Sequence, residues 1–170
     1  MSPPLIALLV VFPAAMAYAA ASDLVWMTIS NRLCLGLIAT FAICALWLGL
    51  GWEQVGGHLA AGALVLVVCF GMFAAGWIGG GDAKLAAATA LWFGFDQLVP
   101  YLAFAGLAGG LLTVLVLKLR SSPLPEWVEN WPWLRRLHAA NEGVPYGIAL
   151  ALSALFVLPE TSLWRAAIGL

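Results

Sequence analysis

Uncharged, strongly apolar stretches alternate with short polar segments along the whole chain. The uncharged stretches are residues 1–22, 33–52, 54–81, 85–95, 97–117 and 143–159. A helix that spans a bilayer needs about 20 mostly apolar residues, so the pattern predicts helices over residues 4–22, 33–52, 58–79, 83–97, 98–118 and 144–159. The fourth stretch is short, so its helix either continues past Asp96 or begins at Asp82, below the membrane surface.

The composition excludes several classes of protein. Hydrophobic residues make up 64% of the 170 residues, charged residues only 9%, and the mean hydropathy is +1.03. Soluble domains carry about 25% charged residues, so a soluble globular fold is excluded, as is intrinsic disorder. Seven Lys and Arg against eight Asp and Glu leave no basic footprint for nucleic acid. The predicted fold class is an all-α integral membrane protein, a six-transmembrane-helix bundle that forms one domain over residues 1–170.

The basic residues predict how this bundle is oriented. With the N-terminus outside, the inner segments hold Arg32, Lys84, Lys118, Arg120, Arg135 and Arg136, and only Arg165 falls outside. Cytoplasmic loops are enriched in Lys and Arg, so we expect both termini on the non-cytoplasmic side and the loop 119–143 in the cytoplasm.

That loop has features of a segment at the membrane interface. Pro125 and Pro132 suit the first turns of two short helices. Trp127, Trp131 and Leu134 fall on one face, which favours contact with membrane lipid at headgroup level. A surface for docking a partner protein is the alternative.

The sequence favours structural rather than metal-binding roles for the three cysteines and two histidines. Cys34, Cys44 and Cys69 all lie in apolar stretches and none belongs to a C-x-x-C pair, so we expect small side chains in the membrane core. His58 and His138 lack the H-E-x-x-H context of a zinc peptidase. The sequence therefore predicts no metal site.

Two of the eight acidic residues stand apart from the loops. Asp23 ends the first predicted helix, and Asp82 follows the run Gly79–Gly81 at the end of the third. In the predicted topology both lie at the cytoplasmic boundary, which suggests aspartic-protease chemistry. Two close carboxyl groups share one proton; the ionised group takes a proton from an attacking water, and the protonated group donates to the peptide carbonyl oxygen.

The glycine run is compatible with this chemistry and with a simpler role. Three glycines let an extended substrate approach the backbone without a Cβ in the way. Alternatively, the run is a turn that ends a helix, with Asp82 capping the next helix and Lys84 marking the inner face. Spacing alone leaves both interpretations open.

Three segments resemble the type IV prepilin peptidase family of membrane G-x-G-D aspartic peptidases. They are Gly79-Gly80-Gly81-Asp82-Ala83-Lys84-Leu85, Asp23-Leu24 with Ile29-Ser30-Asn31-Arg32-Leu33, and Val144-Pro145-Tyr146-Gly147-Ile148-Ala149. The first is similar to G-x-G-D-x-K-L, the second to D-L-x4-I-P-N-x-L, with Ser30 in place of proline, and the third to the start of the family's last helix. The closest likeness is to the short branch that serves Flp pili of tight-adherence systems, because the chain lacks the paired C-x-x-C motifs of the long, methylating members.

The resemblance implies a function and a substrate. Asp23 and Asp82 would be the catalytic pair, and peptidase activity without methylation is expected. The substrate would be a prepilin or pseudopilin whose short basic leader is removed at the cytoplasmic face of the bacterial inner membrane. Pilus or secretion assembly machinery would be a further partner, and neither a metal nor an organic cofactor is implied.

Several other residues are secondary candidates for the site. Gly79 and Gly81 belong to the turn, and Lys84 either orients the leader or marks the inner face. Asn31 either hydrogen-bonds near Asp23 or caps the second helix. Pro145, Tyr146 and Gly147 form either a substrate-facing segment or a plain helix start.

Two other functional classes remain as alternatives. A small proton- or ion-coupled transporter would use Asp23, Asp82 and Lys84 as a relay, but the helices offer no continuing polar path and no matching halves. A non-catalytic subunit of a pilus or secretion assembly would use the Trp-rich loop for docking. It would leave the two aspartate motifs without a purpose.

Overall fold

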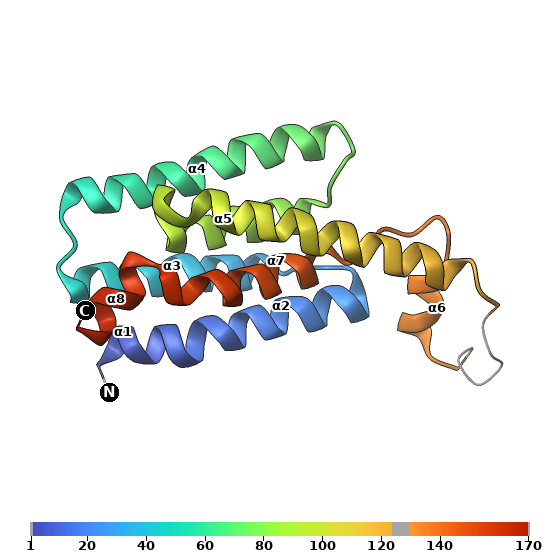
Figure 1. Cartoon of the computed structure of the whole chain (residues 1–170), viewed down its shortest axis with the longest axis horizontal. Coiled ribbons are helices and arrows are strands. Elements are labelled where there is room, and N and C mark those ends of the chain that lie inside the picture. Colours follow the sequence, from blue (N-terminus) through green and yellow to red (C-terminus); the bar gives the residue numbers. More distant parts are fainter. Residues whose placement is uncertain (1, 124–129, 170) are drawn as a thin grey trace.

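The computed structural model describes residues 2–123 and 130–169, and these residues form helices and short connections without a β-strand. Figure 1 shows a bundle of roughly parallel rods with both termini at one end. The elements are α1 (Pro3–Ile6), a π-helical turn (Ala7–Val11), α2 (Phe12–Trp26), α3 (Asn31–Leu48), α4 (Trp52–Ala74), α5 (Gly80–Arg120), α6 (Pro132–His138), α7 (Tyr146–Val157), a 3-10 turn (Leu158–Glu160) and α8 (Ser162–Ile168).

Four of these helical segments have the length and hydropathy of membrane spans. They are Pro3–Trp26, Asn31–Leu48, Trp52–Ala74 and Gly80–Arg120. A fifth is reached if Tyr146–Glu160 and Ser162–Ile168, which are bent by 52° relative to each other, count as one broken span. The all-α membrane fold is thus supported, whereas six spans and the orientation of the termini stay predictions.

The longest helix, α5, has two arms that pack against each other. Gly94 has φ 59° and ψ −168°, so the helix breaks there into residues 80–93 and 95–120. The rings of Phe93 and Tyr101 lie 4.8 Å apart across this turn. A positive φ suits glycine, which has no Cβ, and the ring of His58 closes over this position. The sequence placed the boundary between the fourth and fifth helices at residues 97 and 98, three residues later, because it weighed Asp96 rather than the glycine.

The helix α4 begins and ends earlier than the range 58–79 predicted for it. Its start is set at Gly51, whose N–H donates to the Gln54 side chain at 3.0 Å. Its end is set at Gly76, with φ 76°, where the N–H of Trp77 donates to the Met72 carbonyl at 2.9 Å. This is a glycine-terminated helix end of the Schellman type. Residues 75–79 are consequently a connection rather than helix.

The first arm of α5 lies at the centre of the bundle. Every residue from Leu85 to Gly94 is buried, against α3, α4 and α7. Four of these residues are alanines, and small side chains let neighbouring helices approach closely. At the far end of the arm Trp92 is fully buried, donates its indole N–H to the Leu37 carbonyl at 3.2 Å and packs on Phe12 with ring centroids 5.0 Å apart.

Two arginines attach the segment after α5 to the bundle. Arg120 donates to the carbonyls of Leu137, Glu142 and Gly143 at 2.8–3.0 Å. Arg136, in α6, donates to the Val25 carbonyl at 3.0 Å. The predicted helix start at Pro132 coincides with that of α6, but Pro125 and Trp127 of the predicted interfacial platform lie outside the described residues.

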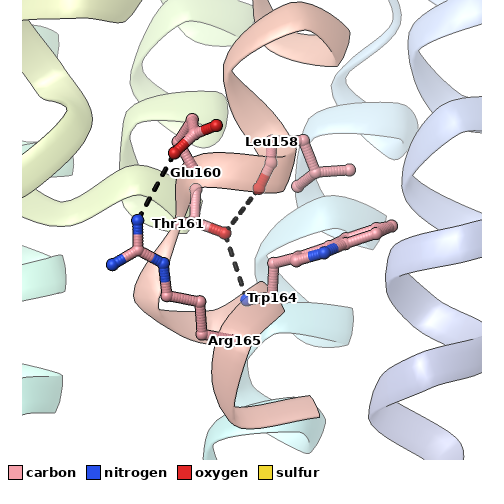
Figure 2. Close-up of polar contacts among 5 residues, drawn as sticks. All are labelled: Leu158, Glu160, Thr161, Trp164 and Arg165. Carbon is pink, nitrogen blue, oxygen red and sulfur yellow. Dashed lines mark hydrogen bonds and ion pairs between the residues drawn. The ribbon is translucent and has the colours of Figure 1, made fainter. Parts of the chain in front are cut away.

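The bend between α7 and α8 is stabilised by a local polar cluster, shown in Figure 2. The hydroxyl of the buried Thr161 donates to the Leu158 carbonyl at 2.7 Å and accepts the Trp164 N–H at 3.1 Å. Glu160 and Arg165 form an exposed ion pair at 3.3 Å. A threonine N-cap of this kind stabilises a helix start by about 1 kcal/mol, so the bend is a defined feature of this end of the molecule.

Candidate active site

Asp23 lies in the last turn of α2 and is buried, with 6% of its surface exposed. Its Oδ2 accepts the backbone N–H of Gly147 at 2.7 Å, from the first turn of α7. A Cβ at residue 147 would come within 2.8 Å of that oxygen. Only glycine therefore lets the backbone of α7 approach the carboxylate this closely.

Asp82 is the third residue of α5, at the same end of the bundle. Gly79 is the N-cap of this helix, with an extended backbone, and the Asp82 carboxylate folds back over it, since a Cβ on Gly79 would lie 2.9 Å from Oδ2. Asp82 is thus the third residue of the helix rather than the N-cap residue, but its side chain lies where a third residue caps a helix start, in agreement with the simpler interpretation of the glycine run. Its Oδ1 is buried and has no hydrogen-bond partner among the described residues.

Ile29 joins the two aspartate-bearing segments. It is buried between two glycines that have no side chain to hold it away. A Cβ on Gly81 would lie 3.3 Å from the Ile29 Cβ, and one on Gly147 would lie 3.0 Å from its Cδ1. Gly81 is next to Asp82 in the chain, and Gly147 is hydrogen-bonded to Asp23, so one side chain contacts both aspartate-bearing segments.

Both aspartates line one cavity of about 860 Å³. Its walls come from the ends of α2 and α4, the connection 76–79, both arms of α5, and the segment that leads into α7 with the start of that helix. Apart from the two carboxylates, the polar side chains in this lining are those of Thr113 and Tyr146, together with the thiol of Cys69. A mostly apolar hollow with a few convergent polar groups is typical of a binding or catalytic site.

Tyr146 and Pro145 shape the wall that α7 contributes. Tyr146 lines the cavity and packs on Gly109 of the second α5 arm, where a Cβ would overlap its ring. Pro145 is buried at the N-cap of α7 rather than in its first turn. Of the predicted trio, Tyr146 thus faces the cavity, Gly147 holds Asp23, and Pro145 precedes the helix.

A scan against protein-family models decides the family. Residues 10–114 match the model described as the type IV leader peptidase family, which is more than half of the chain. The chain belongs to the type IV leader peptidase family. A search of curated proteins and a search of solved structures each gave no significant match.

Membership in the type IV leader peptidase family indicates a peptidase, and the family implies a prepilin as substrate. The matched range contains the segments of Asp23 and Asp82 and ends before the Pro145–Gly147 segment. The hydrogen bond from Gly147 to Asp23 therefore ties a part of the chain outside the matched range to the matched part.

Lys84 and Asn31 lie on the other side of α5 from this cavity. The Lys84 ammonium donates to the Asn31 Oδ1 at 2.6 Å, and both residues line a separate hollow. Neither alternative predicted for Asn31 matches the structure. The cap of α3 is Ser30, whose hydroxyl accepts the Leu33 N–H at 3.2 Å. The Asn31 side chain accepts a hydrogen bond from Lys84 rather than bonding a group near Asp23. Ser30, which departs from the family's proline, thus has a role as a cap.

Some residues of the site were missed in the sequence. Ile29 was noted only as part of a motif, and Gly109 and Trp77 were not singled out. The pair Gly109-Gly110 in an apolar helix is the signal that was available for the Tyr146 contact. Among the described residues, no group of three or more His, Cys, Asp and Glu is placed to hold a metal ion.

Proposed function

We propose that this family member is an aspartic endopeptidase that removes the short basic leader of Flp-like type IV prepilins or pseudopilins. The observation that carries the proposal is the placement of Asp23 and Asp82. They are 59 positions apart in the chain and line the same cavity. Two carboxylates that were only solvated loop charges would not be expected to line the same, mostly apolar cavity.

The chemistry needs the two carboxyl groups and one water molecule. One carboxylate accepts a proton as the water oxygen attacks the scissile carbonyl carbon, and the other carboxyl donates its proton to the carbonyl oxygen. The C–N bond then breaks as the leaving nitrogen takes the proton that the first carboxylate accepted from water, and a hydroxyl proton of the tetrahedral intermediate returns to the second carboxylate. The products are the leader with a new carboxyl terminus and the pilin with a new amino terminus.

The cavity's walls suit an extended peptide that continues into an apolar helix. Gly76, Gly106 and Gly143 line the cavity with nothing within 4 Å of their Cβ positions, which leaves room for a substrate backbone. Ala105 and Gly106 of the second α5 arm line the same cavity, and small residues favour close packing of a second helix in a membrane. A scissile bond at the start of a transmembrane helix fits this arrangement.

The distribution of basic residues supports a cytoplasmic site. The aspartates lie at the end of the bundle where α2 ends and α3, α5 and α7 begin, and α6 lies beyond it (Figure 1). The basic residues of α3, α5 and α6 gather there, whereas Arg165 lies in α8 at the opposite end. We therefore place the active site at the cytoplasmic face of the bacterial inner membrane, with both termini on the other side.

The test is cleavage of a co-expressed Flp-type prepilin, followed by gel shift and N-terminal sequencing. Asp23→Asn and Asp82→Asn keep the size of each side chain and remove its acid–base capacity, so both should stop leader removal. Glu53→Gln is the matched control, because Glu53 is exposed in the first turn of α4, at the opposite end. Membrane levels of all variants are compared by immunoblot.

Two results would contradict the proposal. The first is unchanged processing by either Asp→Asn variant at normal membrane levels, which would remove that carboxyl from the chemistry. The second is the absence of processing by the wild type, which would exclude this class of substrate.

A further inference from the structure

A second hollow of about 430 Å³ lies on the face of the first α5 arm opposite to the aspartate cavity. It runs between α3 and α4, and its floor is made of small or buried residues, Cys34, Gly62, Ala87, Ala88 and Leu91. We call it the Lys84 groove. The exposed side chains of Leu35, Ile38, Leu59 and Leu66 form its rims.

The Lys84 groove is apolar except at one end. There the exposed Lys84 donates to Asn31 at 2.6 Å, a neutral partner. In the described part of the chain the one ion pair is Glu160–Arg165, so no carboxylate from that part neutralises Lys84. Within the described residues, a cation without a carboxylate partner thus lies at the end of a groove whose other lining residues are uncharged.

The groove extends along the helices from this cation towards the middle of the bundle. Lys84 and Leu91 are seven residues apart on α5, which is about 10 Å along a helix axis. Asn31 and Ile38 are equally far apart on α3 and line the same groove. An apolar groove of this length with a positive charge at one end is complementary to a phospholipid, which joins an apolar acyl chain to a negatively charged phosphate.

We propose that the Lys84 groove binds one acyl chain of a phospholipid with an anionic headgroup, whose phosphate accepts hydrogen bonds from Lys84. The Asn31 amide carries two N–H donors beside its oxygen and is placed to donate to the same phosphate. Anionic lipids are attracted to Lys and Arg at the cytoplasmic leaflet. The inference concerns binding alone and stands whether or not the peptidase proposal holds.

A substrate helix fits this groove less well than an acyl chain does. A helix with its side chains is about 10 Å wide, and the groove has half the volume of the aspartate cavity. The groove and the aspartate cavity also have no lining residue in common. A peptide in the groove would therefore not bring its scissile bond to Asp82.

The test measures lipid binding to the purified full chain in detergent by native mass spectrometry. Phosphatidylglycerol and phosphatidylcholine with identical acyl chains are titrated separately. We expect Lys84→Gln to weaken phosphatidylglycerol binding about fivefold and to weaken phosphatidylcholine binding less, because the choline cation offsets the charge of its phosphate. The matched control is Arg32→Gln, which removes a neighbouring exposed cation that does not line the groove.

A second pair of variants tests the acyl-chain part of the site. Ala63 is exposed on α4 and lines the groove, whereas Ala60, one turn earlier, is equally exposed and does not. Ala63→Phe should fill the groove and weaken binding of both lipids, and Ala60→Phe should not. Both are surface substitutions, so the fold tolerates them equally.

Three outcomes would overturn the proposal. Equal effects of Lys84→Gln and Arg32→Gln would mean that lipids respond only to the overall charge of this end. Equal effects of Ala63→Phe and Ala60→Phe would mean that lipids cover the surface without entering the groove. Displacement of the bound lipid by a synthetic prepilin transmembrane peptide would assign the groove to the substrate.

Discussion

Asp82 and Lys84 stand two residues apart at the start of α5, and they line different hollows. The cavity of Asp82 is about 860 Å³ and brings together segments from both halves of the chain; the groove of Lys84 is about 430 Å³ and lies between α3, α4 and the first α5 arm. Residues two positions apart on a helix point about 200° away from each other. Asp82 and Lys84 therefore belong to one sequence motif but lie on opposite faces of α5.

The segment that follows α2 likewise contributes one residue to the surroundings of the aspartates and one to the Lys84 groove. Ile29 packs against Gly81 and Gly147 beside the aspartates, whereas Asn31 bonds Lys84 at the groove. Residues that are close in sequence are thus not all part of one site. The comparison places Asp23 and Asp82, with Ile29 packed beside them, at the proposed active site, and Lys84 and Asn31 at the proposed lipid groove.

The largest expected effect separates the two faces directly. Asp82→Asn should lower prepilin cleavage about 10³-fold, since it removes an acid–base group, and should leave phosphatidylglycerol binding unchanged. Lys84→Gln should do the reverse, with weaker lipid binding and a cleavage loss below about tenfold. Parallel cleavage and native mass spectrometry assays check both. If the two variants affected both assays equally, the division into two faces would be wrong.

A methyl group beside Asp23 is expected to have the next largest effect. In Gly147→Ala the new Cβ lies 2.8 Å from the Asp23 Oδ2, so the carboxylate or α7 has to move. A displacement of about 1 Å at a catalytic group lowers the rate about 10²-fold. Gly143→Ala is the control, because Gly143 lines the same cavity with nothing within 4 Å of its Cβ position. Equal rates for both variants would contradict a positioning role for Gly147.

Ile29 is expected to act through the spacing of the aspartates. Ile29→Ala removes the side chain that packs between Gly81 and Gly147, and we expect kcat to fall about tenfold, or about 1.4 kcal/mol in the barrier, with little change in KM. Ile29→Val keeps the contact with Gly81 and should recover most of the rate. Kinetics per amount of folded enzyme distinguish this from lost stability. A change in protein level alone would show a purely structural role.

The smallest expected effect is that of Asn31→Ala. The variant removes the 2.6 Å bond to the exposed Lys84, and exposed polar pairs contribute about 0–1 kcal/mol. Cleavage should therefore change by less than about twofold, while phosphatidylglycerol binding weakens through the lost amide donors. Cleavage and lipid titration on the same preparation check this. A large loss of cleavage would move Asn31 to the catalytic face.

The candidate site was predictable from sequence in its chemical groups but not in its supporting contacts. Asp23, Asp82 and the glycines around them carry short motifs, and the chain's low charge makes any buried carboxylate conspicuous. Ile29 carries no chemical signal, because its role is a contact with Gly81, 52 positions away, and the Gly109-Gly110 pair does not reveal its partner Tyr146, 37 positions from Gly109. Such contacts depend on how the helices pack, which a single sequence does not encode locally.

The two arms of α5 show where sequence and tertiary structure divide. From the sequence alone, a helical membrane protein and its family could be predicted, and two aspartates could be named as candidates, because hydropathy, charge and motif spacing are local properties. The packing of the helices adds what the sequence leaves open: the first arm is enclosed from Leu85 to Gly94, while the second exposes residues such as Val99 and Leu107. The physical reason is that lipid tails and a protein interior are equally apolar, so hydropathy does not separate a helix that faces lipid from one that faces other helices.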